Sequence, residues 1–316
     1  MNATSTKPID ENETPTTENN HTNPIKMIVF ALGTILLWGS AFVFSKLIQG
    51  QFDPLSISFL RCAISAIFLL ILGRVYHIRK PKNRHLVLFA SGGLTGFSLY
   101  MIAFNSGLFT ITAATSSIII ATVPIFTAIA ATFIYKEHIS FLGWIAIFTA
   151  FSGVLILLLW DGILSINIGI TYTFFAVAMF CTYNLINRKL ILLGYTALEI
   201  TTYCMTFGAI FLAVVSPQAI AELTSASPFS CLVLLYLSIF CSASAYLLWG
   251  RAMYYAKKTS DVTNFLFLVP FVSTILGLFI LKETPNLGTI LGGLTIVISM
   301  YAFQKVNHPT ANNQEE

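Results

Sequence analysis

The stretch VPIFTAIAATFIYKE at 123–137 and the stretch VPFVSTILGLFILKE at 269–283 decide the fold of this chain. Each opens with Val-Pro, continues through an apolar run and closes with Lys-Glu, and the second follows the first at an offset of 146 residues. Tyr100 precedes the first block by the same distance at which Tyr246 precedes the second. A segment long enough for several helices therefore occurs twice, and the chain is expected to consist of two similar halves.

The composition is typical of a membrane protein. Of the 316 residues, 56% are hydrophobic and only 9% are charged, whereas about 25% are charged in an average soluble domain. A helix that spans a bilayer needs about 20 apolar residues, and the apolar segments run over 27–47, 55–76, 86–107, 113–135, 141–160, 167–187, 197–216, 229–250, 261–281 and 287–304. They are longer than barrel strands and do not alternate in polarity. We therefore expect an all-α integral membrane protein with ten transmembrane helices.

The positive charges predict the orientation. With the N-terminus inside and alternating loops, only Lys46, Arg61 and Lys282 of the 17 lysines and arginines lie toward the outer side. Lysine and arginine are concentrated in cytoplasmic loops, so both termini are expected in the cytoplasm, with the chain in the inner (plasma) membrane of a bacterium. Residues 1–26 are predicted to be a disordered cytoplasmic tail, and 305–316 a second cytoplasmic tail.

The two halves are predicted to be inverted relative to each other. The interval from Trp38 to Lys46 in the first span matches that from Phe180 to Arg188 in the sixth, at an offset of 142 residues. The predicted halves, 27–160 and 161–304, contain five spans each. Because five is odd, the second half enters the membrane upside down, which is a frequent plan of secondary transporters.

A proline lies at the centre of span four and another at the centre of span nine. Proline lacks a backbone donor and clashes with the carbonyl four residues earlier, so Pro124 and Pro270 should loosen the carbonyls of Ile120 and Leu266. Within a bilayer, such carbonyls need a partner or a wet cavity. Because both halves carry the proline at the same depth, a hinge or cavity-lining role is favoured over a plain packing kink.

Aromatic and amide side chains inside the spans are candidates for substrate contacts. Membrane tryptophans usually lie at the interface, so the central Trp38 either packs in the core or lines a cavity. A buried tyrosine hydroxyl or asparagine amide needs a hydrogen-bond partner, which a neighbouring helix, water or a substrate can supply. Each such residue alone is more often structural, but the set predicts a substrate cavity; it comprises Trp38, Tyr100, Tyr183, Tyr246, Trp249 and Asn264.

Charges near the span ends are candidates for structural or gating contacts, namely Lys46, Arg61, Glu137 and Glu283. Arg61 lies inside span two, toward its outer end, where a charge is costly unless it is paired or reaches the interface. We predict a structural ion pair between Arg61 and Glu283. A gate, or a contact to a substrate carboxylate, is the alternative.

Signatures of catalysis are absent. The chain has no Walker A loop, no HExxH and no GxSxG. Its acids and histidines lie in tails, loops or helix ends, which disfavours both an intramembrane enzyme and a central proton relay. The five cysteines form no CxxC pair and are interpreted as packing residues. No enzymatic activity, catalytic residue, metal or cofactor is expected, and no basic segment indicates nucleic acid as a partner.

These features together resemble the EamA-type branch of the drug/metabolite transporter superfamily. The resemblance covers about 27–304 and rests on Trp38-Gly39 with Lys46, on Pro54 with Arg61, and on the blocks 124–137 and 270–283. It implies ten helices around a central cavity, alternating access, and transport of amino acids or related metabolites, more often export.

We therefore predict a secondary transporter, or permease, that exports small organic metabolites through an apolar midplane pocket. The alternatives are an uptake or exchange carrier for another class, such as a nucleotide-like metabolite or a cationic drug, and a membrane scaffold or receptor. The expected partners are a small-molecule substrate and membrane lipid. Stripes of small residues on spans five and ten predict close helix packing and also allow a homodimer.

Overall fold

The computed structural model describes residues 22–134, 140–160 and 167–307. Most of the predicted N-terminal tail, the predicted Glu137 site and the last residues of the C-terminal tail lie outside the described residues. Within the described ranges every regular element is helical. The fold is therefore all-α, as the composition predicted.

The first half contains four of the helical stretches that are long and apolar enough to cross a membrane, at Pro24–Ile48, Pro54–Val75, Asn83–Leu108 and Ala113–Ile134. Their elements are α1 (Pro24–Ile48), α2 (Pro54–Val75), η1 (Asn83–His85), α3 (Leu86–Gly93), η2 (Leu94–Leu99), α4 (Tyr100–Leu108), α5 (Ala113–Ile120) and α6 (Val123–Ile134), and α7 (Phe141–Leu159) follows them.

The second half repeats this series. Four more candidate spans run over Ile168–Leu192, Ala197–Val215, Pro228–Tyr255 and Asp261–Leu281, which makes 8 in the described chain. The elements are α8 (Ile168–Leu192), α9 (Ala197–Val215), α10 (Ala219–Ser225), α11 (Pro228–Tyr236), η3 (Leu237–Ser244), α12 (Ala245–Tyr255), α13 (Thr259–Thr263), η4 (Asn264–Leu268), α14 (Val269–Leu276), η5 (Gly277–Leu281) and α15 (Leu287–Asn307). Helices α7 and α15 are apolar as well, over Phe141–Gly153 and Leu287–Phe303.

Polar caps determine where many of these helices begin. Asn23, Asp53 and Ser227 each accept a backbone N–H of the first turn, and a proline follows each cap directly. A proline at the first helical position loses nothing, because that N–H has no partner within the helix. At α9, Thr196 and Glu199 form a capping box.

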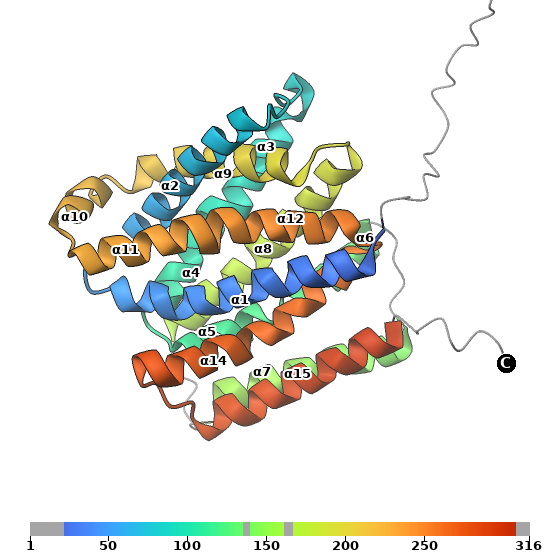
Figure 1. Ribbon diagram of the computed structural model, residues 1–316. Coiled ribbons are helices and arrows are strands. Elements are labelled where there is room, and N and C mark those ends of the chain that lie inside the picture. Colours follow the sequence, from blue (N-terminus) through green and yellow to red (C-terminus); the bar gives the residue numbers. More distant parts are fainter. Residues whose placement is uncertain (1–21, 135–139, 161–166, 308–316) are drawn as a thin grey trace, which may run out of the picture.

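The helices pack in layers, with α1 near the centre (Figure 1). It packs against α12 on one side and α14 on the other, while α2 packs against α9. Helices α7 and α15 lie side by side at one edge of the bundle and pack mainly against each other. A Cβ added to Gly153 would lie 2.8 Å from the carbonyl oxygen of Gly292, so the small residues of this pair allow close backbone contact, as predicted.

Two kinds of irregularity interrupt the spans. The regular helix breaks just before both prolines: α5 ends at Ile120 before Pro124, and the 3₁₀ turn η4 precedes Pro270. In addition, η2 and η3 are π-helical and stand at nearly equivalent places in the two halves. Such π-helical turns are frequent at functional sites.

The outward faces of the helices are apolar. Phe148 on α7, Val214 on α9 and Ile298 on α15 are exposed, together with many other large hydrophobic residues. A soluble protein rarely exposes so much contiguous apolar surface. Together with the apolar spans, this surface identifies the chain as an integral membrane protein whose partners include membrane lipid.

Candidate functional site

A small cavity lies in the centre of the bundle, at the level of both proline breaks. Its walls come from seven helical spans and both halves of the chain. They are formed by Trp38, Ala41, Phe42, Arg61, Tyr100, Met101, Phe104, Ile120, Phe180, Tyr246, Leu266 and Val269. Its volume is about 20 Å³, which is room for about one water molecule. In this conformation the cavity is therefore too small to hold an organic metabolite.

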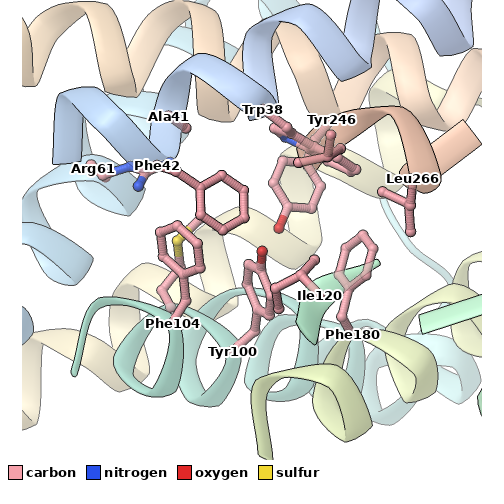
Figure 2. Close-up of a pocket in the computed structure, with 12 residues that line it drawn as sticks. Trp38, Ala41, Phe42, Arg61, Tyr100, Phe104, Ile120, Phe180, Tyr246 and Leu266 are labelled. Atoms are coloured by element: carbon pink, nitrogen blue, oxygen red, sulfur yellow. The ribbon is translucent and has the colours of Figure 1, made fainter. Parts of the chain in front are cut away.

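Tyr100 and Tyr246 enter this cavity from opposite sides. Each residue begins or nearly begins the helix after a π-helical turn, α4 after η2 and α12 after η3. Their hydroxyl groups point toward each other across the cavity (Figure 2). The repeat-related pair therefore supplies polar groups to a site that is otherwise mainly apolar.

The carbonyls of the π-helical turns are hydrogen-bonded by aromatic side chains of the site. Trp38 Nε1 donates to the carbonyl of Cys241 in η3 at 3.1 Å, and the Tyr246 hydroxyl donates to the carbonyl of Gly96 in η2 at 3.3 Å. A wider turn shifts the regular helical bonding pattern and makes carbonyls accessible to neighbours. The two turns thus orient the rings that line the cavity.

An aromatic wall surrounds Trp38. Its ring lies 4.9 Å from Trp249, 5.1 Å from Tyr246 and 5.4 Å from Phe180, measured between centroids. Aromatic pairs at these separations attract each other and hold defined orientations. Phe42 and Phe104 form another such pair, at 4.9 Å, on the side of the cavity near Arg61 (Figure 2).

Of the predicted substrate residues, Trp38, Tyr100 and Tyr246 line the cavity. Tyr183, Trp249 and Asn264 are not among the lining residues. Tyr183 packs on Phe180 and on Tyr246. Trp249 donates to Asn184 Oδ1 at 2.9 Å. Asn264 is buried, and neither polar atom of its side chain has a hydrogen-bond partner.

Pro124 and Pro270 lie outside the lining of the central cavity. Pro124 is buried at the start of α6. Pro270 lines a separate apolar cavity of about 180 Å³ between α14 and α15. The residues that do reach the central cavity are Ile120 and Leu266, whose carbonyls the prolines were predicted to loosen.

The predicted ion pair between Arg61 and Glu283 is wrong. Glu283 instead pairs with Lys46, with 2.9 Å between Oε1 and Nζ. Arg61 is buried on α2, and its guanidinium donates to Ser45 Oγ at 3.1 Å and to Ser242 Oγ at 3.1 and 3.3 Å. The turn beyond η5 carries Glu283 to Lys46, near the end of α1.

Lys46 and Glu283 belong to a contact set at one end of the bundle. Lys46 Nζ also donates to the carbonyl of Ile111 at 2.6 Å, and Glu283 Oε2 accepts the N–H of Ala113 at 3.0 Å. These four residues, which we call the Lys46 cluster, tie α1, α5 and the end of η5 together. The two charged side chains are only 25% and 18% exposed, so this pair is better shielded from water than a surface pair.

A corresponding contact set lies at the opposite end. Arg188 donates to the carbonyls of Met253 and Ala256 at 3.3 Å and of Lys257 at 2.6 Å; we call these residues the Arg188 cluster. Arg188 is the repeat counterpart of Lys46, and Lys257 follows Ile111 by the repeat offset of 146 residues. The same kind of cation-to-carbonyl contact therefore occurs at both ends of the bundle.

Several residues in or next to the cavity were not predicted from the sequence. Phe42 and Phe104 look like ordinary core residues within apolar spans, and Ser45 and Ser242 like ordinary small residues. One available signal was overlooked: Ser45 directly precedes Lys46, and Ser242 lies one helical turn before Tyr246. In the structure both serines accept hydrogen bonds from Arg61, which lines the cavity.

A closed pocket between repeated membrane helices, with a cluster at each end, is typical of secondary transporters. The model of the EamA-like transporter family matches residues 25–159 and again 167–303. The chain therefore belongs to the EamA-like transporter family, within the drug/metabolite transporter superfamily, and the predicted resemblance is confirmed.

Curated relatives of similar length support this family assignment. A probable terminal-alkyne amino-acid exporter of Streptantibioticus cattleyicolor is 25% identical, over 90% of this chain and 94% of its own. An uncharacterized transporter of Archaeoglobus fulgidus is 30% identical, over 87% and 96%. An S-adenosylmethionine uptake transporter of Rickettsia prowazekii is 25% identical, over 81% and 84%.

A solved crystal structure has the same fold. It matches with a TM-score of 0.67 at 16% sequence identity, over 91% of this chain and 100% of that chain. At this identity the likeness concerns the arrangement of the helices alone.

Proposed function

We propose that this chain is a secondary transporter of amino acids or related small metabolites that works by alternating access, with export as its direction. The observation that carries this proposal is the pair of repeat-related clusters, with Lys46 bound to Ile111 and Arg188 bound to Lys257. They stand at opposite ends of one closed cavity. Opening either cluster alone would expose the cavity to one side only, which is what alternating access requires.

The same proposal includes ten membrane crossings arranged as two inverted halves. The family model matches twice, and each match ends in an apolar helix, α7 or α15, after four candidate spans. If α7 and α15 also cross, the loops with the positive charge lie in the cytoplasm. A reporter fused at the C-terminus that is active only outside the cell would contradict this topology.

The substrate class is proposed from the cavity and from the relatives. An apolar pocket with a few polar groups suits a small amphipathic ligand, and Tyr100, Tyr246 and Arg61 provide those groups. The relatives include an amino-acid exporter and an S-adenosylmethionine uptake transporter, and both named compounds contain an amino group and a carboxylate. Neutral or aromatic amino acids fit such a pocket.

Counterflow of radiolabelled amino acids in proteoliposomes tests the proposal. Liposomes loaded with an unlabelled amino acid should accumulate the same labelled compound only when they contain the protein. Trp38→Ala and Tyr246→Ala, both in the cavity wall, should change the apparent affinity or the substrate range. Absence of counterflow across a panel of amino acids and related metabolites would reject the proposed function, and vectorial assays with oriented membrane vesicles distinguish export from uptake.

A further inference from the structure

Arg61 is a buried charge at the wall of the central cavity. Its side chain is 2% exposed, and its position on α2 brings it between α1 and η3. The oxygens that it contacts belong to Ser45 and Ser242. Serine hydroxyls accept hydrogen bonds but carry no negative charge, so they orient the guanidinium without neutralising it.

The described carboxylates are engaged elsewhere. Glu283 pairs with Lys46 and Glu199 with Arg79. Asp53 caps α2, while Glu222 accepts the Asp53 N–H at the same end of the bundle. Within the part of the chain that the structure describes, no carboxylate lies within 4 Å of Arg61. A guanidinium keeps its charge in proteins, and burying it without an anion is expensive.

The two serines use only part of the donor capacity of Arg61, which is one of the residues that line the cavity. A guanidinium has five N–H donors, and the hydrogen bonds to the two serines use three of them. Arg61 lies at one end of the cavity, with Phe42 and Phe104 beside it and the tyrosine hydroxyls beyond them (Figure 2). A ligand in an opened cavity would therefore meet a fixed positive charge at one end and aromatic rings along its length.

We infer that Arg61 binds the carboxylate of an amphipathic organic substrate whose apolar part lies against the aromatic wall. This inference rests on the proposed function and narrows it, because it makes a carboxylate, rather than an amino group, the recognised feature of the substrate. The substrate itself then supplies the missing counter-ion. Cations without a carboxylate are disfavoured at this end of the cavity by repulsion.

Matched probes that differ in one group test this inference. The purified full chain is titrated with 3-phenylpropionate, which has the carboxylate alone, with phenethylamine, which has the amine alone, and with L-phenylalanine, which has both. Binding is followed by tryptophan fluorescence, since Trp38 and Trp249 lie in or next to the cavity wall. The two carboxylates should bind about tenfold to a hundredfold more tightly than phenethylamine, because a hydrogen-bonded charge contact contributes that much affinity.

Three variants assign the effect to Arg61. Arg61→Gln should lose the preference for carboxylates, and Arg61→Lys should keep part of it. Arg251→Gln is the matched control, because Arg251 is exposed and lies over the Phe30 ring, away from the cavity. The melting temperature of ligand-free Arg61→Gln should stay unchanged or rise, since no ion pair is broken; a large fall would assign a structural role instead.

Three results would overturn the inference: equal binding of phenethylamine and the carboxylates by the wild type, an undiminished carboxylate preference in Arg61→Gln, or no binding of any carboxylate at millimolar concentration. The wild-type comparison stands even if a variant does not fold. Counterflow keeps the two proposals separate. Transport of amines but not of carboxylates would support the proposed transport function and reject the role of Arg61. Carboxylate binding that depends on Arg61, without counterflow, would support the role of Arg61 and reject the transport function.

Discussion

At the scale of single residues, the central cavity combines aromatic rings with a few polar atoms at fixed places. Trp38 and Tyr246 each use a polar atom to hold the carbonyl of a π-helical turn. The same rings form the wall that a substrate would touch. A structural role and the proposed binding role therefore overlap in these two residues. A test of binding alone needs a residue whose polar group points into the cavity and holds no helix in place.

Tyr100 is that residue. Tyr100→Phe removes a hydroxyl that points into the cavity and keeps the ring contacts with Phe180 and Phe104, at 5.1 and 5.8 Å between centroids. The apparent affinity for the transported metabolite should weaken about two- to tenfold, since one hydrogen bond contributes about 0.5–1.5 kcal/mol. Counterflow at a series of substrate concentrations measures this, with Tyr301→Phe on the exposed face of α15 as the control. Unchanged kinetics would remove Tyr100 from the site.

Trp38 is expected to contribute to the stability of the fold through its hydrogen bond to the Cys241 carbonyl. Trp38→Phe keeps an aromatic ring but leaves the Cys241 carbonyl without its indole donor, at a place where α1 meets η3. An unpaired buried polar group costs about 1–3 kcal/mol, so the melting temperature in detergent should fall. Trp144→Phe, at a partly exposed site on α7, should have little effect. Equal melting temperatures for the two variants would contradict the role given to the Trp38–Cys241 bond.

At the scale of helices, the breaks at Pro124 and Pro270 could be predicted, because proline has a fixed and local effect on the backbone. The π-helical turns η2 and η3 could not, because a widened turn is set by packing with neighbouring helices and leaves no periodic pattern. The partner of Arg61 was missed for a related reason. Whether Arg61 faces Ser45, Ser242 or Glu283 depends on the rotation of α2 against α1 and η3, and apolar spans of low amphipathicity give no signal for that rotation.

Among the contacts between helices, the Lys46–Glu283 ion pair should show the clearest coupling in free energy of unfolding. Lys46→Gln and Glu283→Gln each remove one charge of a partly buried pair at 2.9 Å, which leaves the other charge without its partner. A double-mutant cycle on thermal stability should therefore give a coupling of about 1 kcal/mol or more, above the median for exposed pairs. Lys282→Gln, next to Glu283 in the chain, is the matched control and should show no such coupling with Glu283→Gln beyond measurement error.

Lys46→Gln and Glu283→Gln also test whether the Lys46 cluster acts as a gate to the cavity. Loss of the pair should favour the state that is open at the Lys46 end, so that a thiol reagent reaches a cysteine introduced at Ala41 in the cavity wall faster than in the parent protein. If the accessibility of that cysteine is the same with and without the pair, the Lys46 cluster fastens helices without controlling access.

At the scale of the whole molecule, the distribution of acids limits how transport can be driven. The described acids, Asp53, Glu199, Glu222, Asp261 and Glu283, all lie at or near helix ends. Proton-driven carriers often keep a carboxylate within the membrane. We therefore expect exchange, facilitation, or a proton route through helix-end acids alone. Counterflow should persist with a protonophore present; if it stops, and no single helix-end acid is required, this interpretation is wrong.

The two ends of the molecule should open in turn, because one cavity of about 20 Å³ lies between two repeat-related clusters that are both closed. Cysteines placed at 46 and 283 and joined by a short reducible cross-linker should hold one end shut and abolish transport until a reductant is added. Cysteines at 188 and 257 should do the same at the other end.

The native cysteines interfere little, since Cys62, Cys181, Cys204 and Cys241 are buried and the half-buried Cys231 can be changed to serine beforehand. The two locked proteins should differ in the side from which a cysteine at Ala41 is labelled. Full transport by either cross-linked protein would show that its cluster does not open during the cycle, and alternating access through these two ends would then be rejected.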